Sequence, residues 1–578
     1  EVAPEVARNA GAGVFVTGAL MRVGQNRLRL DVRAQDSASG QVLHSEKVEG
    51  ENIDAVFKMV DALTVRMAER FLPSGRLPGE APALEEVTTS NVEAYRHYQL
   101  GLEAFRRFET AQALREYEQA VRLDPQFALA WSRIARWYSD FGPRQRAYEI
   151  SQKLDGMQSR LPRRTQLTLQ AERARAGYDW DGAVRALEAL LAEFPRESLD
   201  RSRLASAHRA CGRLDRAIEV LREGLRLDPN DYFLWNELSF GHVLTGNLAA
   251  ALEANDRYGA LLPGAPDSLN SRGALFFITG RNGEAIPACL KSVELDPAAM
   301  GFESRFVLAF VYADQRRFSL AESALREYGR GSKDPRMLFF EAHLEEARGR
   351  VEAARALYRR AVVEQAKANR RETAGQALMA LARISQVLGD SASALAFARE
   401  QRLEGEEHLA ISFLQAVEGD PAGAERSLLK YVSACPWLTP PGIQILRARN
   451  ELAAALQRND AQAARASASR FSIYPESWMP FYEARAALLV KDYGSAEHLL
   501  RRALFFHRWL LAAPARHLRS PLLTLLCHFY LGQVYEATAK REQAVSEYRE
   551  FLSAFEGSAT RLPQISEARA ALKRLGAQ

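Results

Sequence analysis

The residues able to do chemistry are scattered along this chain of 578 residues. Its ten histidines form no His-Glu-x-x-His metal motif, and no Gly-x-Ser-x-Gly turn presents a nucleophilic serine. The glycine loop with its lysine and the His-Arg-Asp motif of protein kinases are also absent from the sequence. We therefore expect no catalytic activity, no cofactor and no metal site within this chain.

Other reactive or charged residues have structural interpretations. The pair Glu406–Glu407, and Asp179 with Asp181, lie at predicted helix ends or turns, where carboxylates cap helices and meet solvent. The glycines of 11–13 precede a strand, and no Lys-Ser/Thr follows them, so they indicate a turn and no phosphate loop. The four cysteines have no metal-ligand spacing and are interpreted as small core residues. They are Cys211, Cys289, Cys435 and Cys527.

A basic stretch between residues 501 and 519 has two interpretations. It is either a solvated face with an irregular loop around Pro514, which we favour, or a contact for an anionic surface. Its members are Arg501, Arg502, His507, Arg508, Arg516, His517 and Arg519. The whole-chain excess of +5, with a pI near 8.9, is small for this length, so we expect no nucleic-acid partner.

The bulk composition is typical of a folded, water-exposed protein, with 47% hydrophobic and 26% charged residues. No apolar run approaches the roughly 20 residues that a membrane-spanning helix needs. The chain begins with Glu1 and shows no signal segment, which we interpret as a removed leader or as part of a longer chain. The compartment stays open between the bacterial cytoplasm and the extracytoplasmic side of the inner membrane.

The front of the chain, residues 1–71, has the pattern of a small α+β domain. Apolar residues alternate with polar ones between 13 and 48, in three runs separated by turns, which predicts an antiparallel meander. The pattern becomes helical from 52 to 71. Residues 1–10 resemble the end of a preceding helix, and the proline- and glycine-rich stretch 72–90 is predicted to be a linker.

A repeat of 34 residues governs the chain from residue 91 onward. Proline, alanine and glycine each recur at that spacing. The prolines are Pro195, Pro229, Pro263 and Pro297; the alanines are Ala183, Ala217, Ala251 and Ala285; the glycines are Gly212, Gly246 and Gly280. Proline ends a second helix, glycine turns between the two helices of a pair, and alanine permits close helix approach. We expect roughly eleven helix pairs over 91–556, and a capping helix within 557–578.

These residues resemble the tetratricopeptide repeat, with Leu100-Gly101, Tyr117 and Pro125 filling its slots in the first copy and Trp131 and Trp235 filling the bulky slot in later ones. The resemblance implies a mainly α fold, a tetratricopeptide-type α-solenoid with a right-handed superhelix and a concave groove lined by first helices. Candidate groove residues for a protein or peptide partner are Asn236, Phe240, Asn270, Phe277 and Phe310. The alternative for the phenylalanines is ordinary core.

The segments 13–18, 27–32 and 39–43 resemble the back half of a TolB-amino-terminal-like domain, which precedes such arrays in bacterial signalling proteins. That resemblance implies a sensory or scaffolding region, with a serine/threonine kinase or cyclase domain upstream in the wider family. We therefore expect a protein-interaction module. The alternatives are a regulatory region of a larger kinase or cyclase and a structural subunit of an assembly. The sequence leaves the oligomeric state open.

Overall fold

The computed structural model divides into two compact units, which meet in sequence between Ala176 and Gly177. Beyond Pro4 and Ala7, the described residues are 12–24, 27–71, 88–106, 110–141, 144–195, 197–297, 299–332, 336–368, 370–401, 405–470, 479–512 and 520–577. The helix end expected at 1–10 and most of the linker expected at 72–90 lie outside the described residues, so these domain boundaries stay predictions.

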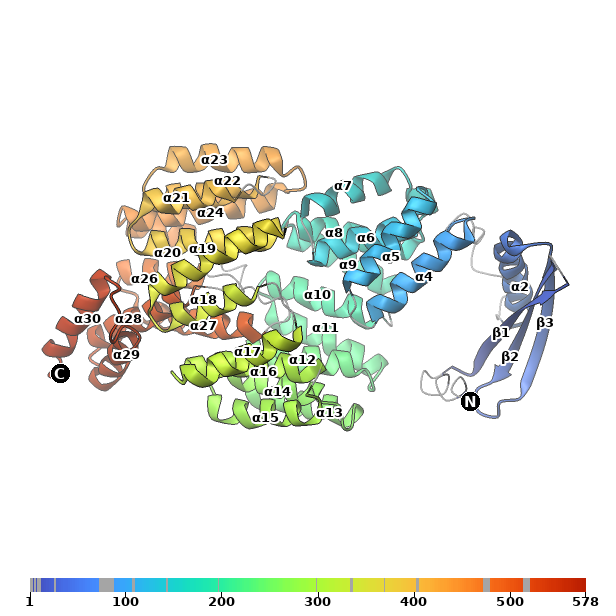
Figure 1. Ribbon diagram of the computed structural model, residues 1–578, viewed down its shortest axis with the longest axis horizontal. Coiled ribbons are helices and arrows are strands. Elements are labelled where there is room, and N and C mark those ends of the chain that lie inside the picture. The colour runs from blue at the N-terminus through green and yellow to red at the C-terminus, as the bar shows by residue number, and fades with distance from the viewer. Residues whose placement is uncertain are drawn as a thin grey trace. The chain divides into compact units, whose positions relative to one another are not determined.

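A three-stranded antiparallel sheet opens the first unit, in the order β1-β2-β3 (Figure 1). The strands are β1 (Val14–Val23), β2 (Arg27–Asp36) and β3 (Val42–Gly50). Leu30 of β2 lies opposite Leu20 of β1 and Val48 of β3, so the apolar members of the alternating pattern share one face. The predicted meander is thus confirmed, with Gly40 supplying the positive φ of +72° that its second turn requires.

One helix, α2 (Val56–Phe71), packs on this sheet, mainly against β3. A short 3-10 turn (Ile53–Ala55) leads into it, and the Asn52 side chain caps that turn by accepting the N–H of Ala55. Buried Phe57, Met59 and Leu63 form the apolar stripe that the helical spacing predicts. The expected α+β arrangement of this segment is therefore present.

The remainder of the first unit is helical. Its helices are α4 (Val92–Arg106), α5 (Thr110–Leu123), α6 (Ala128–Phe141), α7 (Arg144–Asp155) and α8 (Arg163–Ala176), with a 3-10 turn at Gln158–Arg160. The helices α4 with α5, and α6 with α7, form contacting pairs. In the first pair, a Cβ on Gly101 would overlap the ring of Tyr117, which explains why glycine and a large aromatic residue occupy these two repeat positions.

The second unit consists of further helices, which alternate between first and second helices of the repeat. These are α9 (Trp180–Glu193), α10 (Ser198–Ala210), α11 (Leu214–Leu227), α12 (Tyr232–Leu244), α13 (Leu248–Leu261), α14 (Asp267–Ile278), α15 (Asn282–Leu295), α16 (Ala299–Asp314), α17 (Phe318–Ser332), α18 (Met337–Ala347), α19 (Val351–Lys367), α20 (Arg371–Val387), α21 (Ser391–Glu400), α22 (Glu406–Val417), α23 (Pro421–Ala434), α24 (Pro440–Gln457), α25 (Ala461–Ala468), α26 (Met479–Leu489), α27 (Tyr493–Ala512), α28 (Pro521–Ala537), α29 (Arg541–Ser553) and α30 (Pro563–Arg574). From α10–α11 to α28–α29, each even-numbered first helix contacts the second helix that follows it.

The repeat positions have the physical roles that their spacing predicts. Gly212, Gly246 and Gly280 adopt φ between +73° and +76° in the turns between first and second helices. The alanines of the ladder are at most 2% exposed. Indole N–H groups of the bulky slot reach back to the preceding proline turn, with Trp235 Nε1 donating to the Pro229 carbonyl at 2.9 Å. The first and second helices therefore pack as tetratricopeptide pairs.

Contacts between distant parts of the array also occur within the second unit. The helix α27 packs against α14 and α16, and α28 packs against α18. Helices that are roughly 200 residues apart in sequence therefore share one core. Within the described residues, no helix has the length and apolar character needed to cross a membrane.

Candidate functional site

The predicted groove residues lie on three successive first helices of the second unit, α12, α14 and α16. We call the surface that these helices turn toward α27 the inner face. Phe277 and Phe310 do not reach its surface, because they are 1% and 3% exposed and belong to the hydrophobic core. Their assignment to an open groove is corrected: the aromatic side chains fill space between helices, and no surface is left for a partner.

Phe240 is half-buried on α12, and another side chain of the same unit already packs against its ring. The ring of Trp509, from α27, stands against it with 5.7 Å between centroids and planes 88° apart. Both rings belong to a small apolar cluster with the buried side chains Leu275 and Ile278 of α14. The structure thus brings Phe240 to a contact with a distant helix, in the T-shaped geometry that aromatic pairs favour.

The two asparagines lie on α12 and α14, and their side-chain oxygens differ in hydrogen bonding. The Oδ1 atom of Asn270 lies 2.9 Å from Ser304 Oγ, which links α14 to α16. The Oδ1 atom of Asn236 is buried and has no hydrogen-bond partner in the described part of the chain. A buried acceptor without a partner costs about 1–3 kcal/mol. Asn236 is therefore a polar group on this face whose acceptor stays unpaired among the described residues.

The helix that covers the inner face is longer than the other second helices around it. α27 has 20 residues, whereas α11, α13 and α15 have 14 each. Its first part packs between α26 and α28 as a normal second helix, and its end reaches α14 and α16. We call residues 505–512 the α27 extension. Phe505 and Trp509, four residues apart, form its apolar stripe toward the inner face.

Charge also joins the α27 extension to the inner face. Arg508 pairs with Asp314 at the end of α16, with 3.2 Å between Nη2 and Oδ2, and both side chains are about a quarter exposed. The same guanidinium lies against the turn at Gly280. These contacts correct the interpretation of Arg508 as part of a solvated face, because its partner lies 194 residues away in sequence. Arg516, His517, Arg519 and Pro514 lie outside the described residues.

A pair of histidines marks the next contact along α27. The ring of His507 is stacked on the ring of His343 in α18, with 5.9 Å between centroids and planes 11° apart. His343 is fully buried and also meets the edge of Phe310. Burial lowers the pKa of His343 well below its usual value, and the charges of nearby His507 and Arg383 act in the same direction. The imidazole is therefore neutral at pH 7.

A buried carboxylate fixes the start of α28 beside this contact. Glu346 of α18 is 1% exposed and accepts hydrogen bonds from Ser520 Oγ, from the N–H of Leu522 at 3.0 Å, and from Tyr358 Oη at 3.1 Å. Desolvation raises the pKa of Glu346 despite these bonds. All three hydrogen bonds are made to other parts of the chain, so this carboxyl group joins α18 to α19 and to the start of α28.

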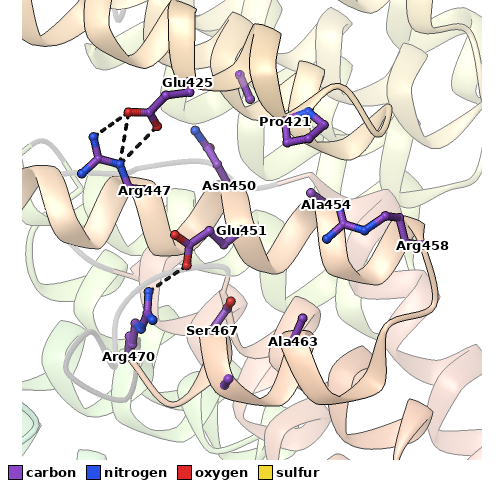
Figure 2. Close-up of a pocket in the computed structure, with 12 residues that line it drawn as sticks. Pro421, Glu425, Arg447, Asn450, Glu451, Ala454, Arg458, Ala463, Ser467 and Arg470 are labelled. Atoms are coloured by element: carbon purple, nitrogen blue, oxygen red, sulfur yellow. Dashed lines mark hydrogen bonds and ion pairs between the residues drawn. The ribbon is translucent and has the colours of Figure 1, made fainter.

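A separate hollow of about 390 Å³ lies between the second helices α23 and α25, with α24 as its middle helix (Figure 2). Small residues, including Ala454 and Ala463, form its apolar part. Two ion pairs line it, Arg447 with Glu425 and Arg470 with Glu451. Arg458, which extends along α24 in Figure 2, has no ion-pair partner among the described residues. The lining therefore carries one cation in excess.

Across the described residues, no group of three or more His, Cys, Asp or Glu side chains is placed to hold a metal ion. The acidic pairs singled out earlier have structural roles. Asp179 accepts the N–H of Gly182 at 2.8 Å as a helix cap, and Asp181 pairs with Arg213. Glu407 accepts the N–H of Gly405.

Comparison with known proteins agrees with the fold. A family model described as tetratricopeptide repeat matches residues 200–240, from α10 into α12. No curated protein matches the chain in sequence. The helical array is thus of tetratricopeptide type, and the fold as a whole is an α-solenoid preceded by a small α+β segment.

Several solved structures are similar to parts of the chain. A thermophilic tetratricopeptide protein of Thermus thermophilus, TTC0263, is 18% identical with a TM-score of 0.25, covering 39% of this chain and 98% of its own. A MamA protein is 20% identical with a TM-score of 0.24, covering 29% and 92%. MamA from Desulfovibrio magneticus RS-1 is 19% identical with a TM-score of 0.23, covering 30% and 96%.

Sequence reasoning missed two features of this region. The α27 extension was visible only as an unusual density of aromatic residues, Phe505, Phe506 and Trp509, inside a basic stretch. The hollow beside α24 was signalled by the alanine-rich run 452–455 and by the brevity of the helix at 461–468. Neither signal specifies which distant helix supplies the partner surface.

Proposed function

We propose that this chain is a protein-interaction scaffold that binds an α-helical segment of a partner on the inner face of α12, α14 and α16. The observation that carries this proposal is the α27 extension, which is an amphipathic helix resting on that face. Its aromatic stripe meets Phe240 and the Leu275 cluster, and its Arg508 meets Asp314. A partner helix with the same pattern fits the same apolar and charged contacts.

The binding role of Asn236 and Asn270 follows from their positions on the face. Asn236 Oδ1 lacks a partner in the described part of the chain, whereas Asn270 is held by Ser304. We therefore propose that Asn236 is the polar contact that orients a partner, and that Phe240 is the apolar contact beside it. Phe277 and Phe310 support the face from within the core and touch no partner.

A site-specific photocrosslinking experiment tests this function. The photoreactive residue p-benzoylphenylalanine replaces Asn236 on the inner face and, as a matched control, the exposed Glu219 on α11. The full chain is then irradiated in its native cells. We expect discrete adducts with partner proteins at position 236 and few at position 219. Equal or fewer adducts at 236, both in the wild-type chain and in a Trp509→Ala variant, would overturn the proposal.

A further inference from the structure

The α27 extension has the properties of an internal ligand. It continues a second helix by about two turns beyond the length of its counterparts, and side chains of those turns contact α12, α16 and α18. Its contacts are of three kinds: the aromatic pair Phe240–Trp509, the ion pair Asp314–Arg508 and the ring stack His343–His507. The first two lie on the inner face, whereas the ring stack is made to α18.

We propose that the α27 extension is a built-in competitor that closes the inner face, and that the partner is an amphipathic helix carrying the pattern aromatic-x-x-Arg-aromatic. This inference rests on the proposed function, because it concerns the same face. In the extension, the pattern is Phe505, Arg508 and Trp509. A partner with this pattern presents its two rings to the Leu275 cluster and its guanidinium to Asp314.

The contacts of the extension set how readily it opens. The Arg508–Asp314 pair is partly exposed on both sides and therefore contributes little net free energy. Phe240, Phe505 and Trp509 are partly buried members of their cluster, so their separation exposes limited apolar surface. Phe506 and Leu511 of the extension are only 2% and 3% exposed, so opening also uncovers these two side chains. A partner therefore displaces the extension only when its own contacts offset that cost.

Closure lowers the apparent affinity of the face for any competing helix. The apparent dissociation constant rises by the reciprocal of the open fraction, so a chain that is closed nine times in ten binds a partner about tenfold more weakly than an open chain. A partner must therefore offset the free energy of displacing the extension through its own contacts with the inner face. The face therefore selects helices that match it better than the α27 extension does.

The test uses a probe made from the chain itself. A fluorescent peptide with the sequence of residues 496–512 is titrated against the full chain and its variants, with binding measured by fluorescence anisotropy. The released variant combines Arg508→Glu with Trp509→Ala. The control variant is Arg216→Glu, which breaks an ion pair of α11 away from the inner face. Hydrogen exchange of residues 505–512 reports opening in each protein.

We expect the peptide to bind the released variant at least about tenfold more tightly than it binds wild type or the Arg216→Glu control. Exchange at 505–512 should rise in the released variant while that of α10–α13 stays unchanged. A peptide carrying Phe505→Ala and Trp509→Ala should not bind. A second released variant, Phe505→Ala with Arg508→Glu, leaves Asp314 and the rest of the inner face intact and should show the same gain.

Equal binding to wild type and to the released variants would overturn the competitor role while leaving the inner face as a binding site. Failure of the peptide to bind either released variant, despite fast exchange at 505–512, would overturn both the competitor role and the proposed function. Unchanged exchange at 505–512 in both released variants would show that these contacts do not hold the extension, and would also overturn the inference.

Discussion

The imidazole rings of His343 and His507 are stacked, with 11° between their planes and 5.9 Å between their centroids, although 164 residues separate them in sequence. One ring belongs to a first helix in the middle of the array, and the other belongs to the end of α27. Protonation of His343 would place a charge in a fully buried position that already faces the cation of Arg383. This contact therefore makes the second unit sensitive to acid.

We predict that His343→Leu reduces the loss of stability on acidification. The pKa of the folded His343 is lowered, so below about pH 6.5 the unfolded chain takes up a proton that the folded chain refuses. Stability from this group is complete above pH 6.5 and declines as the pH falls toward the folded pKa. The decline is about 1 kcal/mol per pH unit, and the variant lacks it.

Urea unfolding between pH 7.5 and 5.0 measures this slope. His242→Leu is a useful comparison, because burial also lowers the pKa of His242 but its ring makes no stack with α27. The wild-type and His343→Leu profiles should converge or cross as the pH falls. Parallel profiles would show that His343 takes up its proton equally in the folded and unfolded states.

Glu483 should give a pH dependence of the opposite sign. Desolvation in α26 raises its pKa to about 7, and the charge of Arg502 offsets this only in part. The folded chain therefore holds a proton that the unfolded chain releases between pH 4.5 and about 7, so stability from this group falls as the pH rises through that window. We predict that Glu483→Gln gains stability relative to wild type from pH 5 to 7.5.

Differential scanning fluorimetry across this range measures the gain. Glu425→Gln, at an exposed ion pair with Arg447, is the matched control. This variant should lose less than about 1 kcal/mol of stability across the range. A Glu483→Gln difference that is constant with pH would mean that the carboxylate is ionised in the folded chain throughout.

Sequence periodicity was sufficient for the parts of the fold that neighbouring residues determine. The 34-residue ladders located the turn glycines, such as Gly246 with φ of +76°, and the strand alternation located the partners of Leu30. Each of these positions is dictated by residues within one helix pair or one hairpin. Their local geometry permits few alternatives, and so the sequence pattern determines it.

The inner face depends on information that local spacing does not contain. The helical spacing of Phe277 and Phe310 is the same whether the rings face a groove or a second layer of helices, and the structure supplies that second layer. The partner of Asp314 lies 194 residues away, and no periodic signal links the two positions. Contacts between distant repeats, such as those of α27 with α14 and α16, therefore cannot be read from the repeat spacing and require the three-dimensional structure.

The hollow beside α24 allows a matched test of two serines. Ser412 is fully buried, donates to the Ala424 carbonyl at 2.7 Å and accepts from Asn450 Nδ2 at 2.5 Å. Ser467 is 5% exposed, lines the hollow and has no hydrogen-bond partner in the described part of the chain. We predict that Ser412→Ala costs about 1–3 kcal/mol, because it leaves the buried Asn450 side-chain N–H without its acceptor.

Ser467→Ala should change the stability by less than about 0.5 kcal/mol. Chemical denaturation of both variants under one set of conditions gives the comparison. A cost for Ser467→Ala equal to that for Ser412→Ala would show that the hydroxyl in the hollow is hydrogen-bonded, for example through ordered water, and that the hollow is more polar than its protein atoms indicate.

Two turn glycines of similar conformation offer a second matched pair, Gly349 between α18 and α19 and Gly389 between α20 and α21. Gly349 and Gly389 have φ of +72° and +79°, so alanine at either position costs about 1–2 kcal/mol. A Cβ on Gly349 would also overlap the Ala554 carbonyl, whereas one on Gly389 meets no atom within 4 Å. We therefore predict a larger loss of stability for Gly349→Ala than for Gly389→Ala, by at least about 1 kcal/mol, because the segment 554–560 must move away from the α18–α19 turn.

Hydrogen exchange of residues 554–560 reports whether this segment is held by the turn. Ser558 and Thr560 of the segment donate to the Gly349 carbonyl at 2.7 and 2.9 Å, so exchange should rise in Gly349→Ala alone. Equal losses with unchanged exchange would mean that the C-terminal segment is not held by the α18–α19 turn.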